Sequence, residues 1–236
     1  MTIYLPQLDA NETSPFPVIE SALNDPDGLL AMGGDLSSVR LLNAYQHGIF
    51  PWYSAGDPIL WWSPSVRGVF FPEQFSPSKS LKKFFRKSKY EVTINKSTAQ
   101  VIEFCASTRS AEETWIMPEM IQAYKRLSMS GICHSVEVWC DNELIGGLYG
   151  LQIGQVFCGE SMFSLQTNAS KIALWQFCEH FLGAGGRLID CQMMNPHLES
   201  LGAIEMKRSD FKVILHNLIN NQVAPSCYLP QSLEVK

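Results

Sequence analysis

Two carboxylates stand inside apolar segments of this 236-residue chain, at positions where a core residue would be expected. Glu160 interrupts the segment 156–164, and Asp190 interrupts the segment 188–192. Burying an ionised carboxylate without a partner costs several kcal/mol or shifts its pKa. Each residue therefore needs a structural partner or a chemical task.

Gln192 lies two residues after Asp190, so in an extended strand both side chains project to one face. A carboxylate that orients a carboxamide can accept a proton from a bound group, a contribution of about 10²–10⁴ in rate. Glu160 would be a second polar anchor in the same cavity. The alternative is structural, with both acids paired to Arg187, backbone amides or other donors.

Other chemistries have weaker support. Cys158 and Cys191 lie beside the acids and could be thiol nucleophiles, but no histidine has a position that marks it as their partner, although such partners need not be near in sequence. The glycine-rich segments 146–150 and 183–186 fit neither G-x-x-x-x-G-K-[ST] nor G-x-G-x-x-G, which argues against an ATP- or NAD-driven reaction. No histidine or cysteine cluster has zinc spacing. We expect no metal and no cofactor. If the chain catalyses acyl chemistry, the acyl donor should arrive already activated.

The composition describes a compact acidic protein. Hydrophobic residues make up 46% of the chain and charged residues 17%, as in a globule with a large core. The formal net charge is −5, so nucleic acid could bind only at a local basic patch. No window approaches the ~18 apolar residues that cross a bilayer. The seven cysteines, scattered without a C-x-x-C pair, favour a reducing compartment, so we expect a cytoplasmic protein without membrane contact.

The elements that would position the acids divide at about residue 62. Residues 1–62 are predicted to form a small N-terminal domain with a helix at 38–47 and a dense aromatic cluster around Trp52. These rings form either a small core or a stacking surface for a base. Residues 63–236 would form the larger domain, with 220–236 as a loosely ordered tail in which 228–230 could dock.

Residues 78–89 predict a helix with one strongly basic face. Leu81, Phe84 and Phe85 fall on the opposite face, and acids are absent from the segment. Such a face is either solvated or a contact for a phosphate backbone. The basic residues at helical spacing are Lys79, Lys82, Lys83, Arg86 and Lys87.

The pattern predicts an α+β fold with a mixed, mainly antiparallel sheet flanked by helices. Its final unit, a strand, a short helix ending in Leu-Gly and another strand, resembles the end of the Gcn5-type N-acetyltransferase fold. That likeness concerns fold and does not assign a substrate.

Eight short motifs occur in order along the chain: 33–36, 45–52, 57–64, 114–116, 147–150, 157–164, 168–171 and 188–192. Together they closely resemble the bacterial leucyl/phenylalanyl-tRNA–protein transferase family, and the match extends from about residue 14 to 230. The resemblance implies a small N-terminal domain joined to a Gcn5-like acyltransferase domain. It also implies transfer of Leu or Phe, and Met less well, from tRNA to the N-terminal Arg or Lys of a protein, which marks that protein for degradation by the N-end rule pathway.

The resemblance also assigns roles to residues. The pocket for the aminoacyl side chain falls on Leu148, Phe157, Phe177 and Ile189, and the terminal adenosine of the tRNA on Trp52 and Trp115. The family often has methionine where this chain has Leu148. The proposed catalytic pair falls on Asp190 and Gln192, and an active-site acid on Glu160. The basic helix matches the patch that holds the tRNA body.

The expected mechanism leaves one choice open. Asp190, aligned through Gln192, would take the proton that the α-amine of the acceptor loses, or a ribose hydroxyl of the tRNA would relay it and leave Asp190 an electrostatic role. We expect a monomer with aminoacyl-tRNA and acceptor proteins as partners. Two rival functions remain. One is an acetyl-CoA-dependent N-acetyltransferase, but this chain lacks the R/Q-x-x-G-x-G/A pattern expected of such an enzyme at 160–170. The other is a non-catalytic tRNA- or peptide-binding protein.

Overall fold

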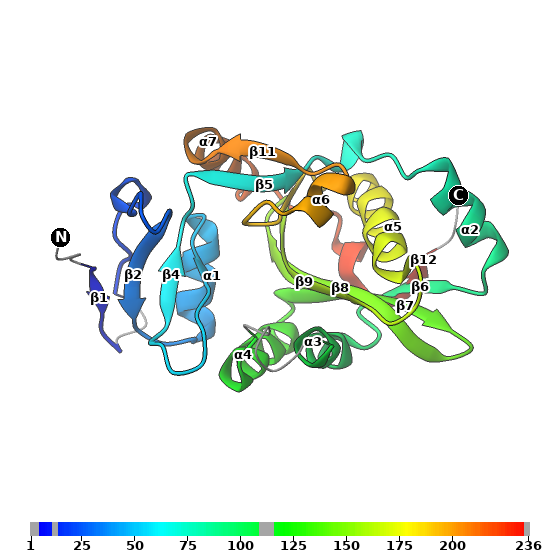
Figure 1. Cartoon of the computed structure of the whole chain (residues 1–236), viewed down its shortest axis with the longest axis horizontal. Helices are drawn as coiled ribbons and strands as arrows, with labels where there is room; N and C mark the ends of the chain where they lie inside the picture. The colour runs from blue at the N-terminus through cyan, green and yellow to red at the C-terminus, as the bar shows by residue number, and fades with distance from the viewer. Residues whose placement is uncertain (1–4, 11–13, 109–115, 234–236) are drawn as a thin grey trace.

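The computed structural model describes residues 5–10, 14–108 and 116–233, which form a small sheet and a large sheet with helices around them (Figure 1). The fold is mixed α+β, as the sequence predicts. Within the described residues, no helix is both long enough and apolar enough to cross a membrane.

The small sheet contains residues from the N-terminal part of the chain, in the order β1-β2-β4-β3. Its strands are β1 (Gln7–Leu8), β2 (Leu29–Gly33), β3 (Phe50–Pro51) and β4 (Leu60–Trp62). Helix α1 (Ser38–Gln46) packs beside it, close to the predicted range, and begins where the Ser37 hydroxyl accepts the backbone N–H of Arg40.

The large sheet has the order β11-β5-β10-β9-β8-β7-β6-β12. Its strands are β5 (Val66–Phe70), β6 (Glu91–Ile94), β7 (Cys133–Cys140), β8 (Glu143–Ile153), β9 (Val156–Ser164), β10 (Leu188–Asp190), β11 (Ile204–Lys207) and β12 (Gln231–Leu233). Strands β9 and β10 are parallel and the other paired neighbours antiparallel. This confirms the predicted mixed, mainly antiparallel sheet.

Helices cover both faces of the large sheet (Figure 1). The crossover helix α5 (Ala169–Gly183) packs on one face, and α3 (Thr98–Ser107) and α4 (Pro118–Met129) on the other. The remaining helices are α2 (Lys79–Lys87), α6 (Pro196–Ser200) and α7 (Arg208–Leu218). Because β9 and β10 are parallel, their connection must cross the sheet, and α5 supplies that crossover.

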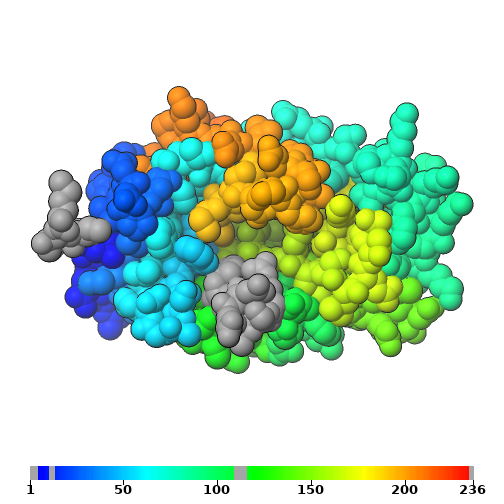
Figure 2. All heavy atoms as spheres, viewed as in Figure 1, coloured from blue at the N-terminus to red at the C-terminus, as the bar shows by residue number. Residues whose placement is uncertain are grey.

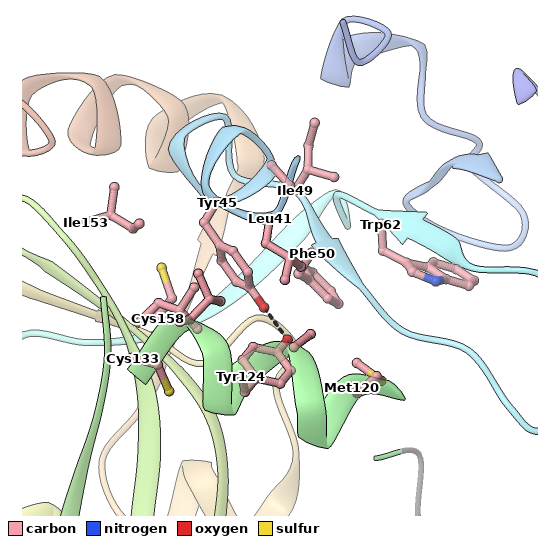
Figure 3. Close-up of a cluster of buried hydrophobic side chains, with 14 of the residues drawn as sticks. Leu41, Tyr45, Ile49, Phe50, Trp62, Met120, Tyr124, Cys133, Ile153 and Cys158 are labelled. Atoms are coloured by element: carbon pink, nitrogen blue, oxygen red, sulfur yellow. Dashed lines mark hydrogen bonds between the residues drawn. The ribbon is translucent and has the colours of Figure 1, made fainter. Parts of the chain in front are cut away.

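One buried cluster joins the small sheet to the large one. Leu41 and Tyr45 of α1 pack with Tyr124 of α4 and with Cys133 and Cys158 from the sheet (Figure 3). A second cluster lies between the sheet and α5. The side chains at the first junction are therefore held by packing from both parts of the chain.

The C-terminal segment is more ordered than predicted. Strand β12 pairs with β6, and Tyr228 stacks on His134 with ring centroids 3.7 Å apart. The side-chain amide of Asn95 donates a hydrogen bond 2.7 Å long to the Tyr228 carbonyl. Within the described residues, the expectation of a loose tail was wrong for 225–233, because a short helical turn at Pro225–Tyr228 and strand β12 order this segment.

We expect His134 to make the protein less stable in mild acid. Burial lowers the pKa of His134 to about 4, below that of an unfolded histidine near ~6.5, so the unfolded chain binds the proton more readily. The free energy of unfolding should therefore fall as the pH decreases from about 6.5 towards 4. His134→Phe keeps a ring against Tyr228 and removes this titration, so urea unfolding should differ less between pH 7 and pH 5. The exposed control His216→Asn should keep the wild-type difference, and equal behaviour of the two variants would contradict the assignment.

Candidate active site

Glu160 reaches the site through an irregularity in β9. The register between β8 and β9 shifts between Tyr149 and Gly150, so that Gly150 pairs with Gly159 while Tyr149 pairs with Ser161. Glu160 is the extra residue of this bulge, and a bulge changes the direction of a side chain. Gly150 makes room for it, since a Cβ there would lie 2.2 Å from the carbonyl oxygen of Cys158.

The Glu160 carboxylate is buried and hydrogen-bonded at both oxygens. Tyr124 donates its hydroxyl to Oε2 at 2.7 Å, and Gln192 donates Nε2 to Oε1 at 2.7 Å. Behind Tyr124, the hydroxyl of Tyr45 lies 2.7 Å from that of Tyr124 (Figure 3). Burial raises the pKa of Glu160 to about 7, and the hydrogen bonds act against this rise. Glu160 can therefore gain or lose a proton near neutral pH.

Asp190 forms a two-point ion pair with Arg67 of β5. Arg67 donates Nε to Oδ1 at 3.2 Å and a terminal nitrogen to Oδ2 at 2.5 Å, with both side chains 1% exposed. Its other terminal nitrogen donates to the Gly48 carbonyl at 3.0 Å, and its guanidinium lies over the rings of Phe50 and Phe211. Both charges are thus paired and hydrogen-bonded, as burial demands.

Gln192 does not continue the strand, so the expected extended geometry was wrong. Strand β10 ends at Asp190, and Gln192 has a φ of 65°. Its N–H donates to Asp190 Oδ1 at 2.9 Å and its carbonyl accepts the N–H of Gly68 at 3.2 Å. This turn still brings the Gln192 amide to Glu160, because the hydrogen bonds to Asp190 and Gly68 hold its backbone in place.

A cavity of about 550 Å³ opens beside these groups. Its lining includes the expected pocket residues Leu148, Phe157, Phe177 and Ile189, together with Trp52, Glu160 and Gln192. Asp190 is not part of the lining, so its carboxylate lies behind the cavity wall. Trp115 lies outside the described residues. In Figure 2, segment 190–200 lies beside the N-terminal part of the chain on the face shown.

The thiols do not suit nucleophilic chemistry. Cys158 is buried, and burial raises the pKa of the Cys158 and Cys191 thiols well above the usual value. Both therefore stay protonated at neutral pH, whereas the nucleophile is the thiolate. In the described part of the chain, no group of three His, Cys, Asp or Glu side chains could hold a metal ion.

The basic residues of α2 lie outside this cavity. Leu81 and Phe85 are buried, and Lys79, Lys82, Lys83, Arg86 and Lys87 line a separate groove of about 290 Å³. None of the five forms an ion pair with a described carboxylate. The predicted division of the helix into an apolar and a basic face is confirmed.

Three residues of the site were missed in the sequence. Arg67 interrupts the apolar segment 66–71, and a buried cation of this kind signals a buried acid elsewhere. Arg67 carries that signal, whereas the structural alternative above names Arg187, backbone amides or other donors as partners of the two acids. Tyr45 and Tyr124 gave no comparable signal, because a tyrosine on a helix face is ordinarily part of the core.

We expect the Arg67–Asp190 pair to dominate the stability of the site. Arg67→Met leaves the Asp190 charge buried and unpaired, which should lower the free energy of unfolding by about 3–5 kcal/mol. The double variant Arg67→Met/Asp190→Asn removes both charges and should recover a large part of that loss. Urea unfolding of the two single variants and the double variant measures this coupling. Additive losses would show that the two side chains do not interact.

Comparisons with known proteins agree with one another. The model of the leucyl/phenylalanyl-tRNA protein transferase N-terminal domain matches residues 34–65, and that of leucyl/phenylalanyl-tRNA protein transferase matches 69–216. A curated protein of Aliivibrio fischeri with that name is 77% identical over 233 residues, covering 99% of this chain and 98% of its own. Its namesake in Photobacterium profundum is 59% identical, covering 100% and 99%.

A solved Staphylococcus epidermidis protein of unknown function aligns at 9% identity with a TM-score of 0.39, over 76% of this chain and 68% of its own, which is too little to support an argument. The two family models match in order along the chain, and the curated relatives match over nearly its whole length. The chain therefore belongs to the leucyl/phenylalanyl-tRNA protein transferase family.

Proposed function

We propose that this chain transfers leucine or phenylalanine, and methionine less well, from aminoacyl-tRNA to the N-terminal Arg or Lys of an acceptor protein. Family membership makes the chain an aminoacyltransferase. The observation that carries the proposal is the cavity in which an apolar wall meets the ionisable Glu160 and the Gln192 amide. The product has a new apolar N-terminal residue, which we propose acts as a degradation signal.

The reaction joins an ester to an amine without nucleotide hydrolysis. The α-ammonium group of the acceptor first loses a proton, and its nitrogen then attacks the ester carbonyl carbon. The new C–N bond forms, the C–O bond to the ribose breaks, and the ribose oxygen leaves with a second proton from the nitrogen. Holding both substrates in one cavity contributes about 7–11 kcal/mol if their orientation is right.

We assign the first proton to Glu160, because its carboxylate borders the cavity and its pKa, raised by burial to about 7, suits a general base. Gln192 then orients Glu160 and the reacting groups. Asp190 is absent from the cavity lining and its carboxylate is ion-paired with Arg67, which favours an electrostatic role over that of general base. In this proposal Asp190 acts through Gln192.

The rest of the cavity suits the donor substrate. Leu148, Phe157, Phe177 and Ile189 would surround the aminoacyl side chain, since all four are buried apolar residues of the lining. Trp52 would carry the terminal adenosine, because its side chain is 36% exposed and braced edge-to-face by Trp62. The basic groove of α2 would hold the tRNA body.

The domain boundary, the fold of the larger domain, the oligomeric state and the cellular location are part of the same proposal. We place the boundary between a small N-terminal domain and a Gcn5-related N-acetyltransferase-like domain at residues 62 and 63, since β4 ends in one sheet and β5 begins in the other. The parallel β9–α5–β10 crossover supports the likeness to acyltransferases. We propose a monomer that works in the cytoplasm, where aminoacyl-tRNA is present.

Glu160→Gln tests the function and the proton acceptor together. We expect labelled leucyl-tRNA and an Arg-ended peptide to yield leucylated peptide with the wild type. The variant should lose about 10²–10⁴ in single-turnover rate, because an amide at this position cannot accept the proton. Its tRNA affinity should stay unchanged in a filter-binding assay. The exposed Glu119→Gln is the matched control, and full activity of Glu160→Gln would reject this role.

A second experiment tests the basic groove. Lys82→Ala/Lys83→Ala should weaken leucyl-tRNA and phenylalanyl-tRNA equally. It should also flatten the dependence of log affinity on log salt by about 0.7–0.9 for each phosphate that is no longer neutralised. Lys125→Ala/Lys212→Ala removes the same charge from lysines that pair with Glu103 and Glu20, and serves as the control. An unchanged slope in the α2 variant would identify that face as solvated only.

A further inference from the structure

A line of hydrogen bonds runs from the cavity into the junction between the two sheets. Gln192 Nε2 donates to Glu160 Oε1 at 2.7 Å, Tyr124 donates to Glu160 Oε2 at 2.7 Å, and the hydroxyls of Tyr124 and Tyr45 are 2.7 Å apart. The four side chains come from the turn after β10, from β9, from α4 and from α1. The line therefore joins the reacting end of the site to the N-terminal part of the chain.

The direction of these bonds depends on the charge of Glu160. The Gln192 amide nitrogen can only donate, so Oε1 must act as acceptor. When Glu160 is ionised, Tyr45 donates to Tyr124 and Tyr124 donates to Oε2. When Oε2 carries a proton, that proton points at the Tyr124 oxygen, and the Tyr124 hydrogen must turn away from Glu160. The arrangement therefore favours the carboxylate over the acid.

Burial strengthens the hydrogen bonds that favour the ionised form of Glu160. Tyr124 is 0% exposed, Tyr45 2% and Glu160 8%, so water does not compete for the three groups as it does at a surface. The line is also braced mechanically, because Tyr45 and Tyr124 belong to the apolar cluster between α1 and α4 (Figure 3). A buried hydroxyl fixed by packing cannot turn away from the carboxylate without losing its partner.

We propose that Tyr124 and Tyr45 are positioning residues for the transfer, which hold Glu160 as a hydrogen-bonded carboxylate and give helix α1 a part in setting the proton affinity of the site. This inference rests on the proposed function. Neither tyrosine lines the cavity, so both act through Glu160. The apolar junction between the two sheets thereby has a chemical role besides its structural one.

Some features of the surroundings of Glu160 raise its pKa and others lower it. Burial raises the pKa most, and the negative charge of Asp190 raises it further, whereas the hydrogen bonds of Tyr124, Tyr45 and Gln192 lower it. Burial and the Glu160 charge raise the pKa of both phenols, which therefore stay protonated and able to donate. Among the described residues, the other titratable groups that face this region are Tyr149, Cys133 and Cys158.

The test is the pH dependence of transfer in Tyr→Phe variants. Single-turnover leucyl transfer to an Arg-ended peptide is measured between about pH 5.5 and 8.5 in wild type, Tyr124→Phe and Tyr45→Phe. Removing a donor removes an influence that lowers the Glu160 pKa, so the midpoint of the acidic limb should rise by about one pH unit in Tyr124→Phe and by less in Tyr45→Phe. Tyr53→Phe, whose hydroxyl donates to Glu119 instead, is the matched control and should keep the wild-type midpoint.

The outcomes separate this inference from the proposed function. If the wild type transfers leucine and the Tyr124→Phe and Tyr45→Phe midpoints equal that of wild type, the positioning role is overturned. A uniform loss of rate at every pH also overturns it, because a merely structural tyrosine behaves in this way. Tyr45→Phe carries the test alone if Tyr124→Phe does not fold. A wild type that transfers no leucine at all contradicts the proposed function instead.

Discussion

The buried ion pair between Arg67 and Asp190 is the interaction on which the rest of the site depends. It ties β5 to its neighbour β10 in the large sheet, and the hydrogen bond from Arg67 to the Gly48 carbonyl connects it to the segment that follows α1. An unpaired charge would be strongly destabilising at this position, because removing either partner leaves the other charge buried without a counter-ion. The pair is stable there because the guanidinium donates to both carboxylate oxygens and to a carbonyl, and lies over the rings of Phe50 and Phe211.

The same pair determines the conformation of the turn that follows β10. Asp190 accepts the N–H of Gln192, and Gln192 takes a left-handed backbone conformation that non-glycine residues rarely adopt. The turn aims its amide at Glu160, which lies at the bulge in the neighbouring strand β9. The bulge at Glu160 and the left-handed turn at Gln192 thus place two polar side chains together in an otherwise apolar cavity. Such departures from regular strand geometry are common at functional sites.

The junction between the two sheets contributes to this corner from behind. Helix α1 belongs with the small sheet, yet its Tyr45 hydroxyl and the carbonyl of Gly48 meet groups that hold Glu160 and Asp190. The apolar cluster around these contacts excludes water and strengthens them. The N-terminal part of the chain therefore contributes the Tyr45 and Gly48 contacts behind the site and also Trp52, which lines the cavity.

The sequence by itself determined the α+β class, the helix at the start of the chain, the two-faced basic helix and the family, because each is written in local periodicity, capping residues or short ordered motifs. It also singled out Glu160, Asp190 and Gln192, since polar residues in apolar strands are conspicuous. Only the tertiary structure decided which of these faces the cavity. The partner of Asp190 is 123 residues away, the bulge at Glu160 depends on pairing with β8, and the tyrosines come from separate helices. Contacts between distant segments and departures from regular strands leave no period in the sequence, so their geometry appears only when the chain is folded.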